Sequence, residues 1–98
     1  VNNTPASVPF VVLRMNDVKS KAPLDSMIAG PLAPFDSVTL RYNFEFVPTD
    51  RMYTNTLYVW KNLNEDPLIS KGFDGNSRIG RWHYTIQTDT ILPKAINH

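Results

Sequence analysis

The chain has 98 residues, of which 42% are hydrophobic and 11% aromatic, and a formal net charge of +1. We expect a single domain over residues 1–98, because this length supports one core and the aromatic content argues against intrinsic disorder. The small net charge provides no long-range field for a polyanion, which argues against nucleic-acid and membrane-surface binding. Cysteine is absent, so disulfides and thiolate metal sites are excluded.

The two ends of the chain are polar or interrupted by proline, so we expect flexible tails at about 1–7 and 94–98. No apolar run in the sequence is long enough to span a membrane. The composition does not fix the compartment. We favour a secreted, cell-surface or virion protein.

The first predicted strand covers Val8 to Met15, a β-branched and apolar run that is typical of a strand buried on both faces. Several prolines and Gly30 then interrupt residues 16–34, which predicts a long crossover. Within it, Leu24 to Ala29 is expected to form one or two helical turns that end at Gly30. The proline-rich part, 22–34, is interpreted as a docking arm or an end-cap.

The clearest alternation in the sequence runs from Ser37 to Val47. Apolar and polar residues occupy strictly alternate positions there, as in a strand with one face in a core and the other in water. The apolar side consists of Val38, Leu40, Tyr42, Phe44 and Phe46. We therefore expect a long strand over this segment.

The next predicted strand, Thr56 to Lys61, has bulky side chains on both faces. Leu57 and Val59 fall on one side, and Tyr58 and Trp60 fall on the other. Such a strand is either central in its sheet or contacts something beyond its own core.

The last third of the chain predicts a short strand over Leu68 to Ser70 and a tight turn at Asp74 to Asn76. Arg81 to Thr88 alternates again and predicts a strand. Ile91 and Leu92 extend it or form a last short strand, which Pro93 is expected to end.

Five to seven short strands separated by turn residues predict an all-β fold, built as a two-layer antiparallel sandwich. An immunoglobulin-like Greek key is the favoured form, although the Cys, Trp and Cys hallmark of that family is missing. A small, partly open barrel of the OB kind is the alternative.

The candidate binding residues are two tryptophans with tyrosine neighbours, together with nearby basic groups. They are Trp60, Tyr58, Trp82, Tyr84, Arg81 and His83. Aromatic side chains on an outward sheet face stack on sugars, bases or partner side chains. The alternative is that they fill the core, which we favour for Trp82 because it shares a face with Ile86; for Trp60 both interpretations stay open.

Catalysis and metal binding find little support in the sequence. Residues 74–77 offer oxygen ligands but lack the spacing of an EF-hand, and a plain turn explains them. His83 alone cannot form a zinc site, and no nucleophile motif accompanies it. We expect a protein that is not an enzyme and has no metal or cofactor.

These features lead to the hypothesis of a non-catalytic, immunoglobulin-like module for protein–protein contact or assembly, with a protein partner or a second copy as the binding partner. The alternative function is binding of carbohydrate or another small ligand through exposed aromatics. A third option is single-stranded nucleic-acid binding, which combines aromatic stacking with basic residues; the charge balance argues against it.

Overall fold

The computed structural model describes residues 1–18, 23–41, 53–75 and 81–96. These residues contain strands and no helix, and so they include no helix long and apolar enough to cross a membrane. The strands are β1 (Phe10–Asp17), β2 (Pro23–Ala29), β3 (Tyr53–Trp60), β4 (Leu68–Gly75), β5 (Arg81–Ile86) and β6 (Ile91–Ile96).

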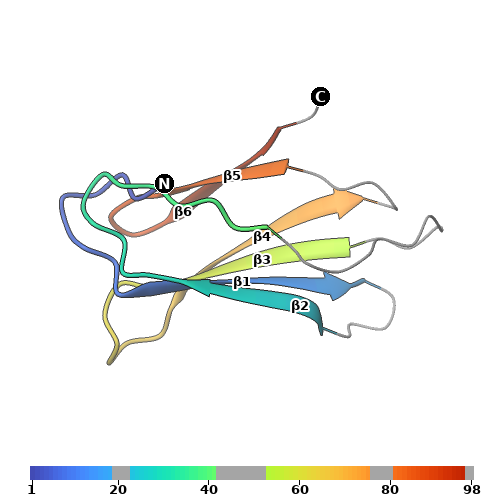
Figure 1. Cartoon of the computed structure of the whole chain (residues 1–98), viewed down its shortest axis with the longest axis horizontal. Helices are drawn as coiled ribbons and strands as arrows, with labels where there is room; N and C mark the ends of the chain where they lie inside the picture. The colour runs from blue at the N-terminus through green and yellow to red at the C-terminus, as the bar shows by residue number, and fades with distance from the viewer. Residues whose placement is uncertain (19–22, 42–52, 76–80, 97–98) are drawn as a thin grey trace.

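Two antiparallel sheets form the two layers of the fold, one with strand order β2-β1-β3-β4 and one with β5 and β6 (Figure 1). Apolar side chains from both sheets form one buried cluster between them, so the predicted all-β sandwich is confirmed. The immunoglobulin-like form is not confirmed. In the A-B-E-D sheet of immunoglobulin domains the first strand lies at the edge, whereas here the second strand, β2, does.

The central strands β1 and β3 show why the sequence forms this sheet. Val11 faces Val59 and Leu13 faces Leu57 across the ladder, and all four side chains are buried against the second sheet. β3 lies between β1 and β4, so the first of the two alternatives predicted for it, a central position, is confirmed. β1 differs from its prediction in two respects: it runs from Phe10 to Asp17 and not from Val8 to Met15, and Arg14 on its other face is exposed, so it is not buried on both sides.

The predicted helical turns at Leu24 to Ala29 are wrong, because this segment is strand β2. A helix of six residues is too short to be stable alone, whereas β1 offers a ladder of backbone partners. Gly30 does end the element, with a φ of 147°. A Cβ at Gly30 would lie 2.5 Å from the Pro9 carbonyl oxygen, so a larger residue would not fit there.

The strand predicted from Ser37 to Val47 is wrong in its first part, since residues 37–41 are not in a strand; residues 42–47 lie outside the described residues. Backbone groups nearby have other partners. Asn2 N–H donates to the Asp36 carbonyl oxygen at 2.8 Å, and Ser37 N–H donates to the Asp36 carboxylate at 2.8 Å. Alternation alone therefore did not produce a ladder over residues 37–41.

The N-terminal segment, predicted as a tail, is packed into the fold. Asn2 and Thr4 are buried, and Asn2 forms a parallel bridge to Ile86 of β5. The Asn2 amide nitrogen donates to the Ala6 and Ala33 carbonyl oxygens at 2.9 and 3.1 Å. Thr4 Oγ1 in turn donates to Asn2 Oδ1 at 2.7 Å. These bonds satisfy both ends of the Asn2 amide, which explains how Asn2 and Thr4 are buried while the other residues of this segment stay exposed.

The C-terminal third contains longer strands than predicted. β4 continues past Ser70 to Gly75, so Asp74 and Gly75 end a strand, and Asn76 lies outside the described residues. β6 continues through Pro93 to Ile96. Proline is tolerated there because β6 has only β5 as a ladder partner in its sheet. The predicted tail thus begins inside a strand, and residues 97 and 98 are not described.

Candidate binding surface

The side of the four-stranded sheet that points away from β5 and β6 is called the outer face here; Tyr58 and Trp60 lie on it. A continuous apolar row crosses this face. Ile28, Val12, Tyr58 and Ile69 occupy paired positions on β2, β1, β3 and β4. The two isoleucines at its ends are 72% and 57% exposed. Neighbouring residues of one row interact through their side chains, so the row forms one apolar strip.

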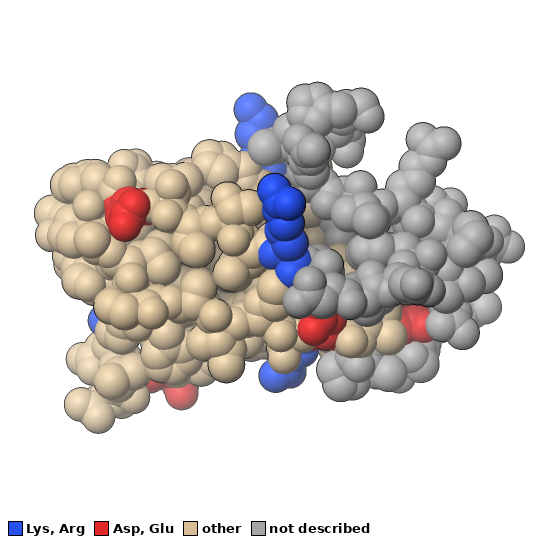
Figure 2. Space-filling view, in the orientation of Figure 1, with Lys and Arg blue, Asp and Glu red and all other residues tan. Residues whose placement is uncertain are grey.

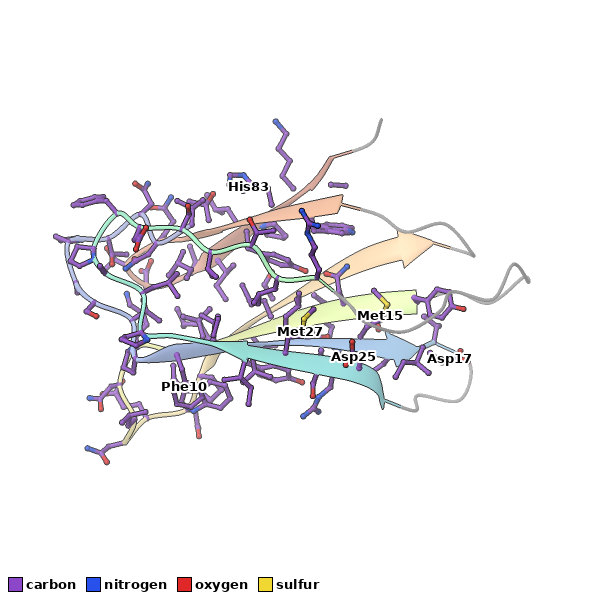
Figure 3. All side chains as sticks on the ribbon, viewed as in Figure 1. Phe10, Met15, Asp17, Asp25, Met27 and His83 are labelled. Atoms are coloured by element: carbon purple, nitrogen blue, oxygen red, sulfur yellow. The ribbon has the colours of Figure 1, made fainter. Side chains whose placement is uncertain are left out.

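An aromatic stack lies beside the row. Phe10 of β1 and Trp60 of β3 are paired, with ring centroids 4.6 Å apart and an interplanar angle of 18°. Tyr58 lies next to them, with its ring centroid 6.1 Å from that of Trp60. Figure 3 shows Phe10 pointing away from the second sheet. Stacking restricts the Trp60 ring, so this part of the surface is preorganised.

Positive charge flanks the apolar row. The Arg14 guanidinium lies over the Tyr58 ring at 5.5 Å from the centroid, a cation–π geometry. Arg14 and Lys71 belong to the two strand pairs on either side of Thr56, and both are exposed. Among the described strand residues that are exposed on the outer face there is no Asp or Glu; the nearest acid is the buried Asp17 at the end of β1. The face is therefore apolar with a basic flank.

A shallow hollow of about 350 Å³ adjoins Tyr58 at the end of β1. It is lined by Asn16, Asp17, Val18, Thr54, Thr56, Tyr58 and Lys71. Asn16 Oδ1 is buried there without a hydrogen-bond partner in the structure. Hydroxyl, amide, carboxylate and ammonium groups beside an aromatic ring form a set that suits a small polar ligand.

The structure separates the six predicted binding residues. Tyr58 and Trp60 lie on the outer face and are half-buried. Tyr84 faces the core, is buried and donates a hydrogen bond to Asn55 Oδ1 of β3. Trp82 packs against the same core, which agrees with the interpretation favoured for it from the sequence.

The two predicted basic members belong to the second sheet. His83 is exposed and points away from the four-stranded sheet (Figure 3), and the side chain of Arg81 lies outside the described residues. Sequence reasoning therefore grouped side chains that the fold does not bring together. It also missed Phe10, Ile28 and Ile69. Phe10 and Ile69 are visible as apolar residues of predicted strands, but only the strand register aligns them with Tyr58 and Trp60.

In the described part of the chain, no group of three or more His, Asp or Glu side chains is placed to hold a metal ion. Figure 2 shows Lys, Arg, Asp and Glu scattered over the visible described surface. Lys61 Nζ donates hydrogen bonds to the carbonyl oxygens of Thr88 and of Gln87, the latter at 3.2 Å. These bonds link the end of β3 to the turn between β5 and β6. Burial lowers the pKa of the Val1 amino group, which donates to the Tyr84 carbonyl oxygen.

Comparison with protein-family models, curated proteins and solved structures finds no match for this chain. Its function is therefore inferred from the chemistry of its own surface, in which the outer face combines exposed apolar and aromatic groups with positive charge.

Proposed function

We propose that this chain is a non-catalytic β-sandwich module that binds a protein partner through the outer face. One observation supports this above all: an apolar row in register across four strands, with Ile28 72% and Ile69 57% exposed at its ends. Single exposed apolar residues are normal on protein surfaces, but a contiguous strip marks an interaction site.

The centre of the outer face has the composition of a binding hot spot. Trp, Tyr and Arg are the residues most enriched at such positions, and Trp60, Tyr58 and Arg14 meet here. The surrounding residues, Ile28 and Ile69, are apolar and would exclude water from this centre.

Charge defines the partner more closely. Arg14 and Lys71 are the exposed charged side chains that the described strands present on this face, and both are positive; Asp17, which lines the hollow, is buried. A complementary partner surface therefore has an apolar centre flanked by Asp or Glu, because like charges at an interface cost several kcal/mol.

A displayed library of random peptides tests this directly. We expect peptides selected on the wild-type chain to be rich in apolar and acidic residues. Tyr58→Ala should weaken their binding by about tenfold or more, as loss of a hot-spot aromatic does. The matched control is Leu92→Ala, which removes a 52% exposed apolar side chain from the outer side of the second sheet. Equal losses in both variants would contradict the proposal.

The hollow beside Tyr58 favours a second candidate, binding of a carbohydrate. Sugars stack on an aromatic ring while their hydroxyls bond to amide, hydroxyl and charged groups, and Asn16, Thr56 and Lys71 supply these. A glycan array tests it with Thr56→Val and Lys71→Met as variants and Leu92→Ala as the control. Binding lost only in the first two supports this candidate; an array without any signal would sink it.

A further inference from the structure

β2 lies at one edge of the four-stranded sheet. β1 pairs with one side of it, and no described strand pairs with the other. At the opposite end of the same sheet, β4 lies close to β6. Open edges are templates for another strand, and proteins usually shorten, charge or bend them.

One hydrogen bond shows which backbone groups of β2 point outward. Ser26 N–H donates to the Asp25 carboxylate at 2.9 Å, and this bond is exposed to solvent. Ser26 N–H therefore points away from β1. Because backbone groups alternate along a strand, the N–H and C=O of Ile28 point outward too, while those of Met27 are directed at β1.

The regular part of this edge is short. The register between β1 and β2 shifts between Met15 and Asn16, so β2 contains an extra residue near Leu24. Gly30 ends the strand at the other side. The segment from Asp25 to Ala29 remains, with Met27 at its centre.

We infer that this segment pairs antiparallel with the same segment of a second copy of the chain, about a two-fold axis at Met27. Ser26 of one copy then faces Ile28 of the other, and their outward backbone groups form about four hydrogen bonds. Asp25 faces Ala29 of the second copy, so no two like charges are opposed. This self-complementarity favours a second copy over an unrelated strand.

The pairing extends the outer face. Two four-stranded sheets become one sheet of eight strands, and the Ile28 side chains of the two copies are diagonal neighbours within contact reach. The apolar row, which ends at an exposed Ile28 in one copy, continues into the second copy. This inference concerns the edge and does not depend on whether the outer face binds a protein partner.

The Asp25 side chain competes with this association. Its carboxylate occupies the Ser26 N–H that the second strand needs. Asp25→Ala removes this competitor and should raise the association constant by roughly tenfold, the equivalent of one to two modest hydrogen bonds.

Sedimentation velocity of the whole chain, at concentrations up to about 1 mM so that weak pairs are detected, tests the inference. We expect a concentration-dependent dimer that is stronger in Asp25→Ala. Ser26→Pro removes the outward N–H and should abolish the dimer, whereas Ser26→Ala keeps this group and the dimer. Proline is tolerated at an outward-facing edge position, and circular dichroism verifies that the variant folds.

A second pair of variants separates the edge from the outer face. Ile28→Lys should abolish the dimer, because lysine on an edge strand opposes strand addition. Ile69→Lys, at the other end of the same apolar row, should leave it intact. A monomer in both the wild type and Asp25→Ala would overturn the inference. So would a dimer that survives Ser26→Pro, or one that Ile69→Lys abolishes, since the latter indicates face-to-face packing.

Discussion

Two strands of this protein each contain two aromatic residues at alternate positions, but one pair points away from the core and the other points into it. β3 has Tyr58 and Trp60 two residues apart, and β5 has Trp82 and Tyr84 two residues apart. The first pair lies on the outer face, where Trp60 stacks on Phe10. The second pair faces the core, where the Tyr84 hydroxyl bonds to buried Asn55.

The residues between and beside the aromatics explain the difference. On β3 the alternate positions hold Leu57 and Val59, which are buried in the core, so the aromatics face outward. On β5 the alternate position holds His83, which is exposed, so the aromatics face inward. An aromatic residue thus faces outward where the alternate positions of its strand are aliphatic and fill the core, and it faces inward where the alternate position is polar.

The largest predicted effect on stability comes from adding a side chain at Gly72 of β4, where Trp82 and Tyr84 already occupy the space. A Cβ at Gly72 would lie closest to Asn55 Oδ1, and 2.8 Å from the Tyr84 hydroxyl oxygen and 2.9 Å from Trp82. Gly72→Val should therefore lower the free energy of unfolding by about 3 kcal/mol, as overpacking does. Urea denaturation measures this.

The control for Gly72→Val is Lys71→Ala, at the neighbouring exposed position on the outer face, which should change stability by less than about 0.5 kcal/mol. Equal losses of unfolding free energy in the two variants would contradict the close packing of β4 against Tyr84 and Trp82.

The next effect concerns the two tyrosine hydroxyls. Tyr84→Phe removes a donor to the buried Asn55 Oδ1 and should cost about 1–3 kcal/mol, because a buried acceptor loses its bond. Tyr58→Phe removes a hydroxyl from the half-buried side chain on the outer face and should cost less than about 0.5 kcal/mol. Thermal unfolding of both variants compares them, and a larger loss in Tyr58→Phe would reverse the assignment of the two pairs.

The face on which a side chain lies was predictable from the alternation of residues along a single strand. The division of β3 into Leu57 and Val59 against Tyr58 and Trp60 followed from alternation, and so did the shared face of Trp82 and Ile86. Alternation misled at residues 37–41, where nearby backbone groups bond to the N-terminal segment and to the Asp36 side chain. A periodic pattern shows that a strand is feasible, but it does not show which neighbour supplies the ladder.

The candidate surface was only half predictable for the same reason. Tyr58 and Trp60 were found because they lie on one strand. Ile28 was missed, because its segment was interpreted as helical turns and only its ladder with β1 makes it a strand. Aligning Ile69 with Tyr58 required the register between β3 and β4, a long-range property that the local sequence does not specify.

The smallest predicted effect tests whether the outward pair is held by charge as well as by stacking. Arg14 lies over the Tyr58 ring at an exposed position, where a cation–π contact contributes about 0.5–1 kcal/mol. A double-mutant cycle of Arg14→Ala and Tyr58→Ala should give a coupling of this size in the free energy of unfolding. Because Arg14 faces Thr56 across the β1–β3 ladder, Arg14→Ala with Thr56→Ala is the matched cycle and should give a smaller coupling. If both cycles give zero, the contact with Tyr58 does not stabilise the fold, and Arg14 can bind a partner without the loss of a favourable interaction with that ring.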